Sequence, residues 1–371
     1  GMGDISHWAY TVGPLAAVIS PFFLGMIADR YFSVEKVLGV MHILGGAAIL
    51  AAPFAVDSPV TFILLLAFHM LCYMPTIGLT NTLAFHNITD QEKQFPLLRV
   101  FGTIGWIVAG VFVSLGLKAE TTAVPFYVAG ISGLLMGVFS FSLPHTPPPA
   151  ADKGKITVRE VLGLDALAQL NSRPFNVFIL SSFLICIPLA TYYNFAPIFA
   201  NDVAISNVAF KMSFGQMSEV LFMLLMPFFF RRLGVKWMLL VGMAAWVLRY
   251  ALFAFAATEG VAWMIMFGII LHGICYDFFF VTGQIYVDKK STPEIRGQAQ
   301  GFLVFVTLGA GMLIGAQVSG WLNNFYKAGN EVLTATAWQS FWWVPAIFAA
   351  VIMVFFLLMF KDEVDSSEVN V

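Results

Sequence analysis

The chain has 371 residues, of which 59% are hydrophobic and 11% charged, with a formal net charge of −2 and a mean hydropathy of +0.84. A soluble globular domain carries about 25% charged residues, so the composition excludes that class and predicts an all-α polytopic membrane protein. The sequence has no run of basic residues of the kind that binds nucleic acid, so we expect no nucleic-acid partner. The sequence has neither a paired His/Glu metal motif nor a nucleophile–base arrangement, so we expect no enzyme activity, no metal and no other cofactor.

The first part of the chain contains five apolar stretches of the length that crosses a bilayer, about 20 residues. They cover residues 8–28, 37–56, 60–85, 96–117 and 123–143. A polar, proline-rich segment begins at Pro144, and residues 156–170 have the apolar spacing of a short amphipathic helix that stops before Pro174. We therefore predict a first helical bundle over residues 1–143 and a linker over residues 144–174.

The second part repeats this pattern with six apolar stretches. They cover residues 175–200, 210–230, 237–257, 261–286, 297–322 and 338–360. A charged tail closes the chain, so we predict a second bundle over residues 175–360 and a tail over residues 361–371. The predicted order is five spans, a linker and six spans.

Lys and Arg gather in the loops on one side of the predicted membrane. That side carries the linker and most of the cations, among them Arg30, Lys153 and Arg231, whereas the other side has Lys118, Lys211 and Lys327. Because cytoplasmic loops are enriched in Lys and Arg, we expect the linker and the C-terminus in the cytoplasm and the N-terminus outside. We expect a multi-pass protein of the cell inner membrane, surrounded by lipid and acting as a monomer.

An acidic residue lies near the middle of the predicted span 210–230. Glu219 follows Gln216 by three residues, so the two side chains share a helical face, and Ser213 extends this polar stripe. A charged acid at such depth costs about 2.5–3.5 kcal/mol on insertion scales, so the stripe needs a wet cavity or polar partners. We expect a functional site here; the alternative is a structural hydrogen bond between packed helices.

Two other spans carry polar residues that we expect to meet Glu219. Arg99 and Thr103 are four residues apart and share a face, and a guanidinium suits carbonyl or hydroxyl groups; the alternative is an arginine that reaches to the membrane interface. Asn194 can donate and accept hydrogen bonds, which suits a nucleobase edge or a sugar hydroxyl. The alternative for Asn194 is a hydrogen bond between two helices.

A second acid, Asp277, lies in the predicted span 261–286. It directly follows Tyr276, which is four residues after His272. A second buried acid suggests either a proton site or the partner of a buried arginine, for which Arg249 is the candidate.

The loop after the first span resembles a known signature. Gly25, Asp29 and Arg30 have the spacing that the major facilitator superfamily carries between its second and third helices. Five spans, a linker and six spans, with the N-terminus outside, resemble that superfamily's two six-helix bundles with the first helix absent. The resemblance implies the major facilitator fold, in which two helical bundles enclose the substrate.

Strings along nearly the whole chain are similar to the nucleoside:proton symporter family of this superfamily. Besides the loop signature they are MPTIGLTN at 74–81, FPLLRVFGTIG at 95–105, LPHTPP at 143–148, GQMSE at 215–219, YDFF at 276–279 and RGQAQG at 296–301. The most specific are the string with Arg99 and Thr103 and the string with Gln216 and Glu219.

The resemblance implies inward, proton-driven uptake of nucleosides through a substrate site between the two halves. It implies that the substrate-binding residues are Arg99, Thr103, Asn194, Gln216, Glu219, Tyr276 and Asp277. We expect Glu219 or Asp277 to take the coupling proton.

Two positions depart from the family pattern and keep other functions open. Thr191 stands where we expect a glutamine, and His272 stands where we expect a tyrosine. The alternatives are another major facilitator porter, such as a sugar:proton symporter, and a non-transporting sensor or fragment.

Overall fold

The computed structural model describes residues 6–20, 31–89, 91–147, 164–203, 205–291, 299, 302–330 and 332–361, and the regular secondary structure within these ranges is helical. The first helices are α1 (Ser6–Ser20), α3 (Val34–Ala51), the 3-10 turn η3 (Ala52–Ala55), α4 (Pro59–Asn87), α5 (Gln91–Val111), the π-helical turn η4 (Phe112–Gly116), α6 (Val124–Ser140) and α8 (Leu164–Leu170). The later helices are α9 (Arg173–Asp202), α10 (Val208–Glu259), α11 (Ala262–Ile270), α12 (His272–Tyr276), the π-helical η5 (Asp277–Val281), α13 (Thr282–Lys290), the π-helical η6 (Phe305–Gly311), α15 (Met312–Lys327) and α16 (Ala335–Met359).

The helices follow the predicted spans, although the number that qualifies as membrane-spanning is smaller than predicted. Within the described ranges, 8 helices are long and apolar enough to cross a membrane, whereas the sequence predicted eleven spans. Two of the predicted spans are joined in the 52-residue α10, and two others correspond to the shorter apolar helices Thr11–Ser20 and Val124–Ser140. The end of the first predicted span and the first part of the amphipathic helix lie outside the described residues.

Gly234 separates the two spans within α10. Its backbone has φ 64° and ψ 178°, a conformation outside the helical region. Glycine reaches positive φ without the steric cost that a Cβ imposes. The chain therefore turns here between the predicted spans 210–230 and 237–257.

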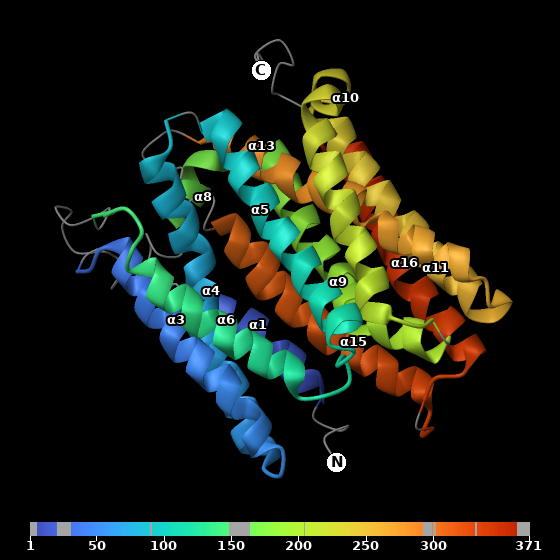
Figure 1. Cartoon of the computed structure of the whole chain (residues 1–371). Coiled ribbons are helices and arrows are strands. Elements are labelled where there is room, and N and C mark those ends of the chain that lie inside the picture. The colour runs from blue at the N-terminus through green and yellow to red at the C-terminus, as the bar shows by residue number, and fades with distance from the viewer. Residues whose placement is uncertain are drawn as a thin grey trace.

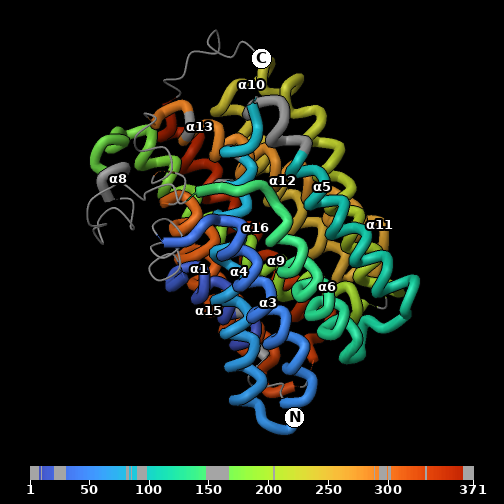
Figure 2. The backbone as a smooth tube through the Cα atoms, turned by 60° about the vertical axis from the view of Figure 1, so that its left-hand side comes forward, coloured from blue at the N-terminus to red at the C-terminus, as the bar shows by residue number. Residues whose placement is uncertain are grey.

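The helices form two groups that lie side by side (Figures 1 and 2). In the first helical group, α3 packs on both α4 and α6, and α1 packs on α4. In the second helical group, α10 packs on α16, α11 and α12, and α9 packs on α15 and α16. The groups meet where α1 contacts η6 and α15, and where α5 lies along α10.

Small residues bring helices of the first group into backbone contact. A Cβ on Gly46 of α3 would lie 2.9 Å from the backbone nitrogen of Leu134 in α6, and a Cβ on Gly130 would lie 3.0 Å from the carbonyl oxygen of Gly46. Larger side chains would separate these helices, because close packing between membrane helices depends on small residues at the interface.

The second group has an aromatic core. Trp246, Trp342, Phe253 and Tyr250 are 0% exposed, and the ring of Trp342 stacks on Tyr250 with centroids 5.9 Å apart. Aromatic side chains bury large areas and pack edge to face or offset. These contacts fix α10 against α16 next to the polar residues described below.

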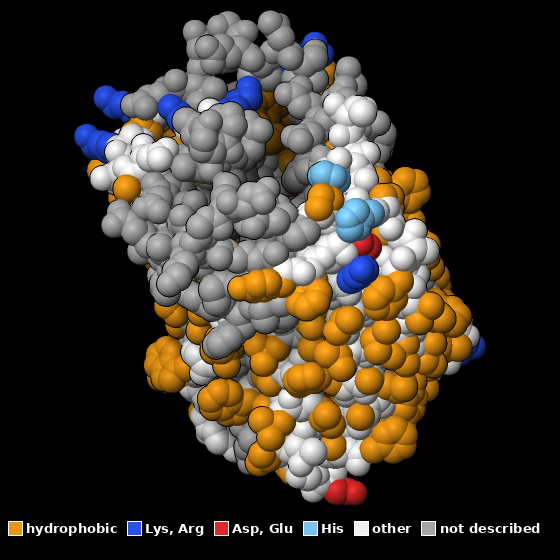
Figure 3. Space-filling view, turned by 90° about the vertical axis from the view of Figure 1, so that its left-hand side faces the viewer, with side chains coloured by type: hydrophobic (Ala, Val, Ile, Leu, Met, Phe, Trp, Pro, Cys, Tyr) orange, Lys and Arg blue, Asp and Glu red, His pale blue; other side chains and the backbone are white. Residues whose placement is uncertain are grey.

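The outer surface is apolar over a wide area. Phe54, Phe101 and Leu358 are 79%, 72% and 72% exposed. Figure 3 shows one face on which hydrophobic side chains form a broad surface, while most of the visible Lys and Arg side chains lie towards one end. Apolar area of this extent requires a cover other than water, which lipid provides for a membrane protein.

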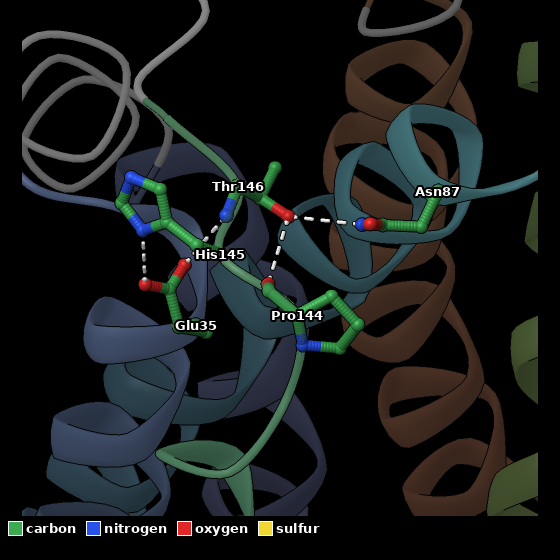
Figure 4. Close-up of polar contacts among 5 residues, drawn as sticks. All are labelled: Glu35, Asn87, Pro144, His145 and Thr146. Atoms are coloured by element: carbon green, nitrogen blue, oxygen red, sulfur yellow. Dashed lines mark hydrogen bonds and ion pairs between the residues drawn. The ribbon is translucent and has the colours of Figure 1, made fainter.

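The first residues of the linker are bonded to the ends of α3 and α4 (Figure 4). The buried carboxylate of Glu35 accepts a hydrogen bond of 3.0 Å from the Thr146 backbone N–H, and His145 Nδ1 lies 3.0 Å from Glu35 Oε1. The Val34 N–H donates to the Thr146 carbonyl at 2.9 Å, and Asn87 Nδ2 donates to Thr146 Oγ1 at 3.0 Å. These contacts fix the start of the linker against the first group. We call this end of the molecule, at the start of α3 and the end of α4, the linker end.

Candidate functional site

The polar residues of α10 and α5 meet at Glu219. Thr103 Oγ1 donates a hydrogen bond of 3.1 Å to Glu219 Oε1. The two helices approach closely because α5 has a glycine at the contact: a Cβ on Gly110 would lie 2.7 Å from Ser213 Oγ. The spacing of Ser213, Gln216 and Glu219 on one face thus directs this polar stripe of α10 towards α5.

Arg99 brings a positive charge to the same place. It lies one turn before Thr103 on α5 and interacts electrostatically with Glu219, Tyr276 and Asp277. The structure therefore brings together one cation and two carboxyl groups that are far apart in the sequence. Such a set can hold a polar solute by charge-assisted hydrogen bonds.

Asp277 is fully buried and does not pair with Arg249, the candidate partner. It is 0% exposed, and neither carboxyl oxygen has a hydrogen-bond partner among the described residues. Arg249 instead donates through Nε to the Gly268 carbonyl at 3.0 Å, and its guanidinium carbon lies 4.1 Å from the centroid of the Tyr192 ring. The alternative of an Arg249–Asp277 ion pair is therefore wrong for this structure.

Asp277 also begins the π-helical turn η5. A single π turn within an α-helical span widens the helix, and such turns are frequent at functional sites. Asp277 thus lies in the same span as Tyr276 and His272, next to Glu219.

The amides of the site differ in their contacts. Gln216 Oε1 is buried and has no hydrogen-bond partner among the residues that the structure describes. Asn194 Nδ2 donates to Ser319 Oγ of α15 at 3.0 Å. The alternative considered for Asn194, a hydrogen bond between two helices, is therefore present here, whereas Gln216 has an unused acceptor.

His272 also belongs to this cluster, although the sequence did not predict it as a site residue. Its Nε2 lies 3.9 Å from Glu219 Oε2, and its ring stacks on Tyr192 with centroids 5.6 Å apart. The sequence showed only its spacing from Tyr276; the contact with Glu219 depends on how α12 packs against α10.

Other predicted features are outside the cluster or outside the described residues. The signature residues Gly25, Asp29 and Arg30 are not among the described residues. Within the described ranges, no group of three or more His, Cys, Asp or Glu side chains could hold a metal ion. The cluster is therefore a set of hydrogen-bonding and ionisable side chains at the middle of apolar helices.

The chain is similar to known proteins over almost its whole length. The model of the family described as "Nucleoside H+ symporter" matches residues 3–365. The putative nucleoside transporter YegT of Escherichia coli is 40% identical over 370 residues, which covers 97% of this chain and 86% of that protein. The nucleoside permease NupG of Escherichia coli is 32% identical, over 94% of this chain and 85% of that protein.

A solved structure of the same relative has the same fold. The crystal structure of an aspartate-to-alanine variant of the nucleoside transporter NupG matches with a TM-score of 0.83 and 30% sequence identity. The match covers 96% of this chain and 90% of the NupG chain.

Proposed function

Because this chain belongs to the nucleoside H+ symporter family, a family of transporters and not of enzymes, we propose that it takes up nucleosides together with protons. The two helical groups would rock against each other and expose one central site to each side of the membrane in turn. We propose the inner membrane as its location, with the linker end in the cytoplasm, since Lys and Arg gather in the loops of that end.

The substrate site is proposed at the contact between Thr103 and Glu219. This hydrogen bond of 3.1 Å is the observation that carries the proposal, because it joins α5 to α10 through polar groups inside two apolar spans. The unused acceptor of Gln216 and the guanidinium of Arg99 suit ribose hydroxyls and the edge of a base. Asn194 and Tyr276 complete the proposed set, with Asn194 leaving Ser319 when substrate binds.

The coupling proton is proposed to bind at Glu219 or Asp277. An ionised carboxylate within the membrane is costly unless a cation or hydrogen bonds compensate it, and protonation removes that cost. A proton from outside would neutralise the acid together with substrate binding, and release of both to the cytoplasm would restore the ionised acid.

Uptake into proteoliposomes tests this proposal. With an inward proton gradient, the purified protein should accumulate labelled uridine, and a protonophore should abolish the accumulation. Glu219→Gln should lose gradient-driven accumulation, because an amide does not take up a proton in this range. The matched control is Glu120→Gln, at an exposed position outside the helices.

Three results would contradict the proposal in different ways. Absence of uridine accumulation by the wild-type protein, with binding but no flux, would indicate a sensor. Competition by sugars and not by nucleosides would indicate a sugar porter. Full accumulation by Glu219→Gln would exclude Glu219 as the proton carrier.

A further inference from the structure

We propose that His272 is the proton-sharing partner of Glu219, so that carboxylate and imidazole form one buried acid–base couple held in place by Arg249 through Tyr192. The inference rests on the proposed symport function and specifies how its proton is held. It adds two residues, His272 and Arg249, to those that the sequence predicted.

The side chains of His272 and Glu219 lie close together and are largely buried. His272 Nε2 and Glu219 Oε2 are 3.9 Å apart, and the side chains are 3% and 12% exposed. This distance is longer than a hydrogen bond but within the range of an ion pair. One added proton, on nitrogen or on oxygen, allows an N–H···O or O–H···N bond between them.

The proton balance of the couple is simple. In the ionised state Glu219 carries one negative charge and the imidazole none. A proton from outside forms one N–H or O–H bond and brings the couple to zero net charge, and the same bond breaks when the proton leaves to the cytoplasm. When the helical groups change from one open side to the other, a couple without net charge avoids the cost of a charged carboxylate within the membrane.

Backbone contacts hold together the two helices that carry the couple. A Cβ on Gly273 would lie 2.5 Å from the carbonyl carbon and oxygen of Ser218, and a Cβ on Gly215 would lie 3.1 Å from His272 Cβ. The backbones of α12 and α10 are thus in direct contact next to His272 and Glu219. Their separation depends on two glycines and not on flexible side chains.

The second nitrogen of the imidazole is left without a partner within the described ranges. His272 Nδ1 is buried and has no hydrogen-bond partner among the described residues. A buried nitrogen without a partner costs free energy. A change of protonation during transport gives a reason for a histidine at this position.

Aromatic rings hold the imidazole plane. Tyr192 stacks on His272 at 5.6 Å and 18°, Tyr276 lies at 5.7 Å and 33°, and Tyr193 contacts the ring edge-on at 6.1 Å and 79°. Stacked and edge-on rings restrict the rotation of the side chain. The Nε2 atom is therefore kept on the side of Glu219.

Arg249 holds the stacked rings of Tyr192 and His272 in position. Its side chain is 0% exposed, its guanidinium carbon lies 4.1 Å from the Tyr192 ring centroid, and its Nε donates to the Gly268 carbonyl. Gly268 is four residues before His272 on the same span, so Arg249 contacts both the ring and the backbone that place the imidazole. A desolvated cation over an aromatic ring is a favourable contact.

Several charged or titratable groups surround the couple and enter its pH dependence. Arg99 on α5 and Asp277 on η5 interact with Glu219, and Arg249 on α10 interacts with His272. The remaining groups are the phenols Tyr192, Tyr193 and Tyr276. Asp277 is the competing proton site, and it remains a candidate if His272→Gln accumulates uridine like the wild-type protein.

His272→Gln in the full chain tests the couple. Accumulation driven by a proton gradient should fall at least about tenfold, since a positioned proton-transfer group is lost, and its dependence on pH should flatten. Exchange of labelled for unlabelled uridine at equal concentrations needs no net proton release and should persist with a similar KM. His69→Gln is the matched control, because His69 Nδ1 bonds the Gly45 carbonyl at 2.8 Å in the first group.

One further variant keeps the test decisive if His272→Gln does not fold. Arg249→Lys keeps the charge and loses the planar contact with Tyr192, so it should shift the pH profile of accumulation while the KM for exchange stays similar.

Two results would overturn the inference. One is a wild-type level of accumulation with an unchanged pH profile in His272→Gln, which would leave Asp277 or Glu219 alone as the proton site. The other is an equal loss of exchange and accumulation in Arg249→Lys and His272→Gln, which would make both residues purely structural. Neither result affects symport itself, whose failure would appear as absent accumulation by the wild-type protein.

Discussion

At the scale of single residues, the site depends on a few polar atoms whose partners come from another helix. Glu219 Oε1 accepts its hydrogen bond from Thr103, and Oε2 faces His272. A hydrogen bond to a charged group contributes about 1.5–3 kcal/mol, more than a neutral one. Removing the single hydroxyl of Thr103 is therefore a sharp test of the cross-helix contact.

Thr103→Val keeps the shape of the side chain and removes this donor. We expect a loss of about 1.5–3 kcal/mol, or roughly 10- to 100-fold, in the kcat/KM of uridine uptake. Thr80→Val is the control, because Thr80 Oγ1 donates only within its own helix, to the Thr76 carbonyl at 2.7 Å. Equal uptake by the two variants would mean that the Thr103 hydroxyl does not act on Glu219.

At the scale of helices, glycines determine which side chains meet. Gly273 allows the α12 backbone to touch α10 at Ser218, and Gly110 allows α5 to touch α10 at Ser213. Membrane helices lack a hydrophobic driving force between them, so close packing of small residues has a large share in their association. Both contacts flank Glu219, one on each side of its helix.

Gly273→Ala should push α12 away from α10. The added methyl group would meet backbone atoms at 2.5 Å, and overpacking of this kind costs about 1–3 kcal/mol. We expect a lower melting temperature in detergent together with weaker proton-driven uptake. Gly78→Ala on α4 serves as the control, since its Cβ would meet nothing within 4 Å; the same melting temperature in both variants would contradict the close contact.

At the scale of the whole molecule, the two helical groups meet along two lines of contact. One runs between α5 and α10, where Gly110 faces Ser213. The other runs between α1 and the later helices, where Gln317 Nε2 donates to Thr11 Oγ1 at 2.8 Å and Gly309 faces Val18. Alternating access requires these contacts to change while each group keeps its internal packing.

A disulfide between Gly110→Cys and Ser213→Cys should stop transport. A Cβ at position 110 lies close enough to position 213 for a bond between helices, and the link would prevent separation of α5 from α10. Uptake should cease on oxidation and return with a reducing agent.

The control for this disulfide joins two helices of the first group. Gly45→Cys would face the native Cys72, with Cβ atoms 3.1 Å apart, and a link there should leave uptake unchanged. Continued transport by the oxidised 110–213 variant would contradict a rocking motion at this contact.

The sequence alone determined the class of protein and the placement of its helices. Lipid offers no hydrogen-bond partners to the backbone, so long apolar stretches must be helices, and α4, α9 and α16 follow the predicted spans 60–85, 175–200 and 338–360. The polar stripe with Glu219 and Gln216 was visible for the same reason, since few polar residues occur in such stretches.

Only the tertiary structure decided which polar groups meet. The sequence left Asp277 as either a proton site or the partner of Arg249, and the structure places that arginine against Tyr192 and Gly268. The sequence suggested substrate contact or a helix bond for Asn194, and the side chain bonds Ser319. It gave no sign that His272 faces Glu219. Periodicity along one helix fixes which residues share a face, whereas the partner of that face depends on how separate helices pack, through contacts such as Gly273 on Ser218.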